Sequence, residues 1–229
     1  MIKSDSYAIS DFHFGAKGIL NWERTQFATP QEHDEHILAC MRRWYEKAAP
    51  GSVLWVLGDF GDTEMLEPFF NAVSGSGKFI ELNFVAGNHD KAADLYKFEE
   101  YFDNVYNHPV YAGRRLILSH EPQWPIPVGC ANIHGHTHNA HLDSKQHVTV
   151  SCNDIDYKPF KFSKLNGIYS NIERSCMKFL WEPYAEQYVF HDKTRNDIVM
   201  NPLTGKIDLP ASRALQRSMR DENWNLKHD

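Results

Sequence analysis

Gly87-Asn88-His89-Asp90 is the stretch that decides how this sequence is interpreted. It follows an apolar run at residues 79–85, which is typical of a buried strand. Residues 91–102 come next and carry apolar side chains at helical spacing. The four residues therefore lie on a predicted strand-to-helix turn, where α/β proteins place their chemistry. They offer an amide oxygen, an imidazole and a carboxylate, although the same residue types also form ordinary turns.

Two earlier segments repeat this arrangement of a strand that ends in polar side chains. The predicted strand at residues 7–10 ends in Asp11-Phe12-His13. The predicted strand at residues 52–57 ends in Gly58-Asp59-Phe60-Gly61-Asp62. Strand, polar side chain and helix thus recur three times, which is typical of an α/β fold with ligands gathered at one edge.

A helix is predicted between the first two of these strands. Residues 29–32 form a Thr-Pro-Gln-Glu helix start, and the apolar spacing continues until just before Pro50. His33 and His36 lie in its first turns among acidic residues, and we interpret both as surface residues.

The second half of the sequence adds more strand ends that carry histidines. His120 follows a predicted hairpin within residues 105–119, and His136 and His138 follow a short apolar segment at residues 131–133. Another strand is predicted at residues 148–151. These short segments indicate a second sheet, richer in antiparallel strands, that packs face to face with the first sheet under flanking helices.

Composition and charge restrict the classes of protein to which the chain can belong. It has 229 residues, of which 42% are hydrophobic, and a formal net charge of −6. No apolar run approaches the roughly 20 residues of a membrane span, and the N-terminus lacks a signal-peptide pattern, so a cytoplasmic protein is expected. The negative charge predicts no strong non-specific binding to nucleic acid. Four cysteines without a CxxC pair are expected to be reduced thiols.

Five motifs occur in an order that resembles the calcineurin-like metallophosphoesterase superfamily. They are Asp11-Phe12-His13, Gly58-Asp59-Phe60-Gly61-Asp62, Gly87-Asn88-His89-Asp90, Ser119-His120 and Gly135-His136-Thr137-His138. Each motif alone is a weak signal, whereas five in this order are specific. Residues 10–15 and 156–159 also resemble a small bacterial and phage branch of predicted phosphoesterases. The resemblance implies an α/β fold, a four-layer α-β-β-α sandwich with two mixed sheets, and a catalytic core at residues 1–166.

The resemblance implies a site for two divalent metal ions at the strand ends. The implied ligands are Asp11, His13 and His138 for one ion, Asn88, His120 and His136 for the other, and Asp59 as a bridge between both. Nitrogen and oxygen ligands without a thiolate suit Mn²⁺, which is our first expectation, and also Fe, Co, Ni or Zn²⁺. Two such ions outweigh two carboxylates and a hydroxide, so the loaded site would attract a phosphate ester.

By the same resemblance, a hydroxide that bridges the two ions would attack phosphorus in line. His89 is the candidate general acid for the leaving oxygen, and Asp62 is its implied partner. Arg24 is a candidate contact for the phosphate, together with Asn88 and His89. These assignments predict that His89→Ala slows turnover while the metal content stays near normal.

Several readings remain open at the level of sequence. A small diester such as a cyclic nucleotide is the favoured substrate, although monoester and diester are not distinguished. A nuclease acting on single-stranded ends is the alternative enzyme, and a scaffold that kept the fold without the chemistry is the alternative from another class. His108 and His141 could line the mouth of the site. Residues 167–229 form a C-terminal extension that could mediate self-association.

Overall fold

The structure is a computed structural model that describes residues 5–75, 77–112, 115–127, 129–140, 142 and 144–169, and two strands at residues 188–190 and 198–200. The chain divides into two compact units, Met1–Ser170 and Asn171–Asp229. In the second unit, strands β10 (Tyr188–Phe190) and β11 (Ile198–Met200) pair in antiparallel fashion. The rest of the predicted C-terminal extension from residue 170 onward, and a role for it in self-association, lie outside the described residues.

The first unit contains a five-stranded sheet in the order β4-β3-β2-β1-β9. Four of its strands are parallel and one edge strand is antiparallel. The strands are β1 (Ser6–Ile9), β2 (Val53–Leu57), β3 (Glu81–Val85), β4 (Asn104–Tyr106) and the antiparallel β9 (Phe160–Lys161). The central strands are buried along almost their whole length, which agrees with their continuous apolar runs.

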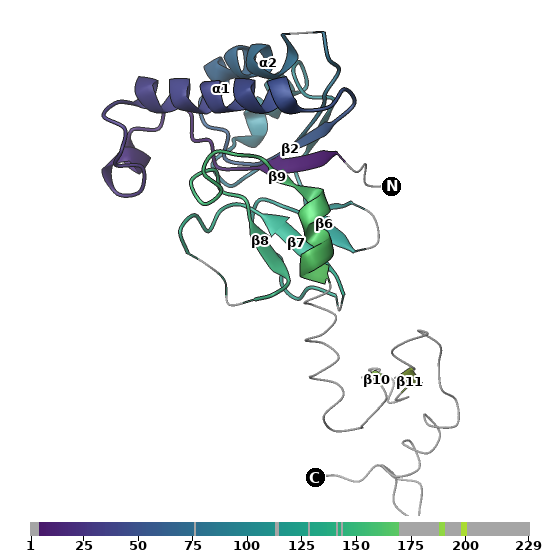
Figure 1. Cartoon of the computed structure of the whole chain (residues 1–229). Helices are drawn as coiled ribbons and strands as arrows, with labels where there is room; N and C mark the ends of the chain where they lie inside the picture. The colour runs from purple at the N-terminus through teal and green to yellow at the C-terminus, as the bar shows by residue number, and fades with distance from the viewer. Residues whose placement is uncertain are drawn as a thin grey trace, which may run out of the picture. The chain divides into compact units, whose positions relative to one another are not determined.

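Two helices cover one face of this sheet, as Figure 1 shows, and they are α1 (Pro30–Lys47) and α2 (Leu66–Ser74). The predicted start of α1 is confirmed, because Thr29 Oγ1 accepts a hydrogen bond from the Glu32 N–H at 3.1 Å. Beneath the helices lies a core rich in phenylalanine. Phe84 and Phe98 stack there with ring centroids 4.2 Å apart.

The helix predicted over residues 91–102 is wrong in its length. The segment instead forms two short turns, η3 (Ala92–Asp94) and α3 (Leu95–Phe98). Phe98 and Phe102 are still buried, since the Phe102 N–H donates to the Phe98 carbonyl at 2.8 Å and keeps both rings on one side. The apolar spacing therefore reports which side chains are buried but not how far the helix runs. Other single-turn helices are η1 (Gly18–Asn21), η2 (Thr63–Met65) and η4 (Phe162–Lys164).

The second sheet has four strands in the order β5-β6-β7-β8. They are β5 (Val110–Tyr111), β6 (Leu116–Leu118), β7 (Ala131–His134) and β8 (His147–Thr149). Only β5 and β6 are antiparallel, whereas β6, β7 and β8 are parallel. Our expectation of a sheet richer in antiparallel strands is therefore wrong, because loops of a dozen residues join β6 to β7 and β7 to β8 in place of tight hairpins.

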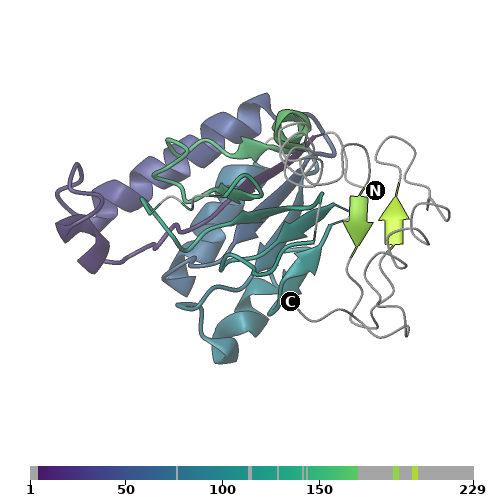
Figure 2. The same cartoon turned by 90° about the horizontal axis from the view of Figure 1, so that it is seen from below.

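The predicted four-layer sandwich with two mixed sheets is confirmed (Figures 1 and 2). The helical residues 162–169 form the layer opposite α1 and α2. The Tyr169 hydroxyl donates to the Arg115 carbonyl beside β6 at 3.1 Å. Within the described residues, no helix has both the length and the apolar character that crossing a membrane requires.

A parallel bridge between Ser10 and Ser151 joins the end of β1 in the first sheet to the segment after β8 in the second. The Ser10 N–H donates to the Val150 carbonyl at 2.9 Å, and the Cys152 N–H donates to the Ser10 carbonyl at 3.0 Å. The carboxyl ends of β1 and β8 therefore lie side by side. This junction brings the first motif of the sequence next to the last.

Candidate metal centre

The seven predicted ligands follow the ends of strands from both sheets, and the structure brings them together. Asp11 and His13 follow β1, while one ligand follows each of β2, β3 and β6, and two follow β7. The loops that carry them meet in backbone hydrogen bonds. The Asp11 N–H donates to the Gly58 carbonyl at 3.0 Å, and the His13 N–H donates to the Asp59 carbonyl at 2.9 Å.

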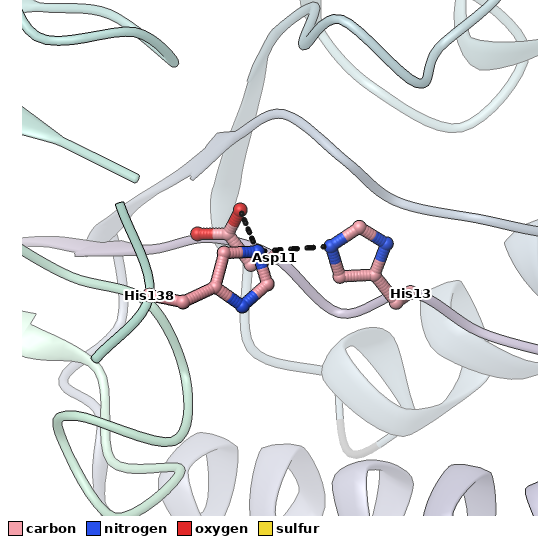
Figure 3. Close-up of side chains that lie close together, drawn as sticks. All are labelled: Asp11, His13 and His138. Carbon is pink, nitrogen blue, oxygen red and sulfur yellow. Dashed lines mark hydrogen bonds and ion pairs between the residues drawn. The ribbon is translucent and has the colours of Figure 1, made fainter. Parts of the chain in front are cut away.

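One group within this cluster consists of Asp11, His13 and His138 (Figure 3). The Nε2 atoms of the two histidines face each other at 3.4 Å, and His138 Nε2 lies 3.6 Å from Asp11 Oδ1. The three ligand atoms all lie within 4.8 Å of one another. Two nitrogens and one oxygen at this spacing fit around a shared divalent ion.

The second group centres on the Asn88 amide. Its Oδ1 lies 2.9 Å from His120 Nε2 and 2.9 Å from His136 Nδ1. Asp59 lies between the two groups, because its Oδ2 is 3.5 Å from His13 Nε2 and its Oδ1 is 3.4 Å from His120 Nε2. A carboxylate in this place has one oxygen available to each group, which suits a bridging ligand.

The backbone at the cluster is held in a conformation that residues other than glycine rarely adopt. Five of the seven predicted ligands have a positive φ, and they are Asp11 (58°), His13 (50°), Asp59 (51°), His136 (67°) and His138 (47°). Left-handed backbone at aspartate or histidine costs free energy that the surrounding structure has to offset. Its concentration here indicates that the loops are shaped to aim side chains at one place.

The charges of the cluster are strongly coupled. Burial raises the pKa of Asp59, but the hydrogen bond and charge of His120 outweigh burial and lower this pKa to about 2. Burial in turn lowers the pKa of His120, yet the Asp59 and Asp11 carboxylates raise it to about 9. For His13, burial dominates and lowers the pKa to about 4, which keeps the imidazole neutral as a metal ligand requires.

Asp90 is a site residue to which the sequence assigned no role. Its Oδ2 accepts hydrogen bonds from the Asp59 N–H at 2.8 Å and the Gly87 N–H at 2.7 Å, and its Oδ1 accepts from the Phe60 N–H at 3.0 Å. One carboxylate thus ties the loop after β2 to the loop after β3. Its place in the Gly87-Asn88-His89-Asp90 motif was the signal that could have identified it.

Glu23 is a second residue that the sequence did not identify. Its side chain is fully buried, and its carboxylate oxygens lie 2.6 and 2.8 Å from His138 Nδ1. The Nδ1–H of His138 therefore donates to Glu23, which leaves Nε2 free to face Asp11 and His13. Asp11 is held in a similar way, because the hydroxyls of Ser10 and Ser151 both donate to its Oδ2.

Arg24 is not positioned to contact substrate, contrary to our expectation. It is completely buried behind the site, where its guanidinium donates to the main-chain carbonyls of Asp11 and Phe12. Its Nη1 atom also lies 2.7 Å from His33 Nε2. His33 is itself fully buried and 3.1 Å from Asp34, so its interpretation as a surface residue is wrong. The reason is that the loop before α1 folds over the start of the helix.

The predicted general acid His89 lies on the open side of the cluster. Its ring is 66% exposed, its Nε2 is 4.0 Å from Asp59 Oδ2, and its backbone N–H donates to Asp59 Oδ1 at 2.9 Å. Among the described contacts, Asp62 has none with His89. Its Oδ1 instead accepts from the Glu64 N–H at 3.0 Å at the start of η2. His108 is exposed beside the cluster, and His141 lies outside the described residues.

Comparison with known proteins decides the family. Residues 7–153 match the model of the calcineurin-like phosphoesterase superfamily domain. The chain belongs to this superfamily. Calcineurin-like phosphoesterases are hydrolases that act on phosphoesters with divalent metal ions. The acidic and histidine groups described above could hold such ions.

Three other proteins are similar to this calcineurin-like phosphoesterase. The uncharacterized protein MJ1445 of Methanocaldococcus jannaschii is 25% identical over 166 residues, which cover 67% of this chain and 84% of that protein. The protein of unknown function AQ665 from Aquifex aeolicus has 22% identity and a TM-score of 0.53, over 71% of this chain and 98% of that one. Pseudomonas putida nuclease MPE has 20% identity and a TM-score of 0.40, over 59% and 62%. The likeness to AQ665 supports the fold alone.

Proposed function

We propose that this protein hydrolyses a small phosphoester with two divalent metal ions, and that it prefers a diester such as a cyclic nucleotide. The observation that supports this most directly is the position of the Asp59 carboxylate. It is almost fully buried, and it has one oxygen beside His13 and the other beside His120. Mn²⁺ is our first expectation for the metal, and Fe, Co, Ni and Zn²⁺ also suit imidazole and carboxylate ligands.

The charges of the site support phosphate as the group that it binds. Two divalent ions bring four positive charges, and the carboxylates of Asp11 and Asp59 offset two of them. Glu23, bonded to His138, offsets a third, so one net positive charge remains to attract an anionic ester until a water at the site loses its proton. When bound, the ions would supply Lewis-acid activation of water and of the phosphoryl oxygens.

His89 has the position expected of the group that protonates the leaving oxygen. Its backbone N–H is fixed on Asp59, so its side chain stays beside the site, while its exposed ring can exchange protons with water. His89 is not needed as a metal ligand, because the seven candidate ligands would supply the sites of both ions. A partnership with Asp62 requires that the Asp62 carboxylate turn from the Glu64 N–H toward His89.

Metal analysis followed by a substrate panel tests the proposed function. The purified protein is stripped with a chelator and reloaded with Mn²⁺ or, in parallel samples, with Fe, Co, Ni or Zn²⁺. Each sample is assayed on p-nitrophenyl phosphate, bis(p-nitrophenyl) phosphate, cyclic AMP isomers and single-stranded oligonucleotides. We expect about two ions per chain and metal-dependent hydrolysis of small esters, fastest with diesters. Degradation of oligonucleotides alone would indicate the nuclease, and no hydrolysis with any of the five metals would indicate a non-catalytic scaffold.

The role of His89 is tested separately by His89→Ala. We expect turnover to fall by about 10²- to 10⁴-fold, the usual contribution of a general acid, while the metal content stays at the wild-type value. A variant that also loses its ions would show that His89 is a ligand or a structural residue instead.

A further inference from the structure

A cavity of about 390 Å³ opens directly beside the predicted ligands Asn88 and His120, which form part of its wall. The end of β3, with the apolar Val85 and Ala86, also lines it. This volume lies within the range of pockets that bind small molecules. A phosphate placed at the metal centre would therefore leave the rest of its ester next to this cavity.

The loop after β6 forms one wall of the cavity and is firmly held. The Glu121 carbonyl accepts hydrogen bonds from the Ser119 hydroxyl at 2.6 Å and from Gln123 Nε2 at 3.0 Å. The Gln123 N–H donates to the buried Asn132 side chain at 2.8 Å. The backbone of Glu121 is thus fixed on both sides, whereas the residue itself is exposed at the cavity.

The chemistry of the lining restricts what the cavity can bind. Glu121 is the only acidic residue among the described lining residues, and none of them is lysine or arginine. Asn107, which also lines the cavity, adds an uncharged amide. Because no lysine or arginine is found along the described part of the lining, the Glu121 carboxylate favours an uncharged group there over a second phosphate, and it accepts hydrogen bonds from hydroxyl groups. A lining that combines apolar residues with polar ones suits a ring that bears hydroxyls.

We propose that this cavity, the Glu121 pocket, binds the uncharged, hydroxyl-bearing part of a small phosphoester, of the size of a nucleoside, and that Glu121 accepts hydrogen bonds from its hydroxyl groups. The inference rests on the proposed function, because it takes the phosphate to be held beside Asn88 and His120. It goes further in naming the chemical class of the group attached to that phosphate. A polynucleotide fits this pocket poorly, since its next phosphate would approach the Glu121 carboxylate.

Equilibrium binding separates this proposal from catalysis. The Mn²⁺-loaded protein is titrated by calorimetry with inorganic phosphate, with phenyl phosphate, which has a ring but no hydroxyl, and with AMP, whose nucleoside bears two hydroxyls. We expect AMP to bind more tightly than phenyl phosphate, and phenyl phosphate more tightly than inorganic phosphate. All titrations are run at one free Mn²⁺ concentration.

The variant Glu121→Ala identifies the group responsible. We expect the ratio of AMP affinity to inorganic phosphate affinity to fall about tenfold, since a hydrogen bond to a charged group is lost. The same ratio for phenyl phosphate should stay within about twofold, because removal of a charge near the phosphoryl group affects all three ligands alike. Glu35→Ala, the same charge change at an exposed position on α1, should leave every ratio unchanged.

Each other outcome has a distinct meaning. If inorganic phosphate binds but the affinity for AMP is no higher than the affinity for phenyl phosphate, the pocket proposal is overturned and the proposed function still stands. An equal loss for AMP and phenyl phosphate in Glu121→Ala would also overturn it, because the effect would not depend on hydroxyls. If the Mn²⁺-loaded protein binds none of the three ligands, the proposed function itself fails, and the pocket proposal fails with it.

Discussion

The two halves of the proposed metal centre are built differently. One half, which we call the buried position, consists of Asp11, His13 and His138, whose side chains are 0%, 12% and 16% exposed. The other half, the open position, consists of Asn88, His120 and His136, of which only His120 is buried. The side chains of the buried position thus lie mostly inside the protein, whereas two of the three side chains of the open position lie at its surface.

The residues that hold the candidate ligands in place also differ between the two positions, and they are more numerous at the buried one. At the buried position, Ser10 and Ser151 donate to Asp11, and Glu23 fixes His138. At the open position, His120 Nδ1 bonds to the Leu57 carbonyl at 2.9 Å, while Asn88 contacts the other two ligands of its own group. More negative charge and more fixed ligands favour the buried position, so we expect the two ions to bind with unequal affinity.

The largest expected effect comes from the residue that both positions share. Asp59→Ala should lower the binding affinity for both ions, because one oxygen of the Asp59 carboxylate faces each half of the site. We expect activity to fall by more than the roughly 10- to 100-fold that outer partners of a metal site contribute. Metal content measured by mass spectrometry and circular dichroism of the same sample check this. Retention of both ions at wild-type affinity would contradict a bridging role.

The next largest effect is a contrast between two histidines of one motif. His136→Ala removes a proposed ligand of the open position, and we expect this variant to retain one tightly bound Mn²⁺. His138→Ala removes a ligand of the buried position, and we expect it to lose the tighter binding event. Mn²⁺ titrations followed by electron paramagnetic resonance of the free ion distinguish them. Identical titration curves for the two variants would show that the halves are equivalent.

A smaller effect should come from the carboxylate that supports His138. Glu23→Gln keeps the shape of the side chain but removes its charge, so His138 Nδ1 loses its carboxylate partner. We expect Mn²⁺ affinity at the buried position to fall about 10- to 100-fold, with little change at the open position. Glu35→Gln, at an exposed position on α1, is the control and should bind as the wild type does. An equal loss at both positions would place the effect in the overall charge instead.

The contrast also separates what the sequence could predict from what it could not. The seven candidate ligands could be selected from the sequence, because each follows an apolar segment and lies in one of five motifs whose order resembles the superfamily; the structure places them in one cluster. Glu23 could not be selected in this way, since a single glutamate in a loop has no local pattern that indicates a histidine 115 residues away in the chain. Ser151 meets Asp11 only through the bridge between the sheets.

The errors in the sequence interpretation have a related physical origin. His33 lies among acidic residues, which is typical of a solvated face, yet the guanidinium of Arg24 covers it. That contact depends on how a loop folds back over α1, and no periodicity reports it. Strand direction in the second sheet was missed for the same reason, because short strands have the same pattern whether their neighbours are parallel or antiparallel.

The smallest effect expected at the buried position comes from the hydroxyl of Ser10. Ser10→Ala removes one of the two hydroxyl donors to Asp11 Oδ2 and leaves Ser151 in place. A hydrogen bond to a carboxylate contributes about 1.5 kcal/mol at the low end of its range, so we expect Mn²⁺ affinity at the buried position to fall about tenfold. Ser74→Ala serves as the control. The Ser74 hydroxyl donates to the Phe70 carbonyl in α2, and we expect its removal to leave Mn²⁺ affinity unchanged. If Mn²⁺ affinity falls at the open position alone, the assignment of Asp11 is wrong, because the carboxylate that lost a hydrogen-bond donor would then belong to the open position.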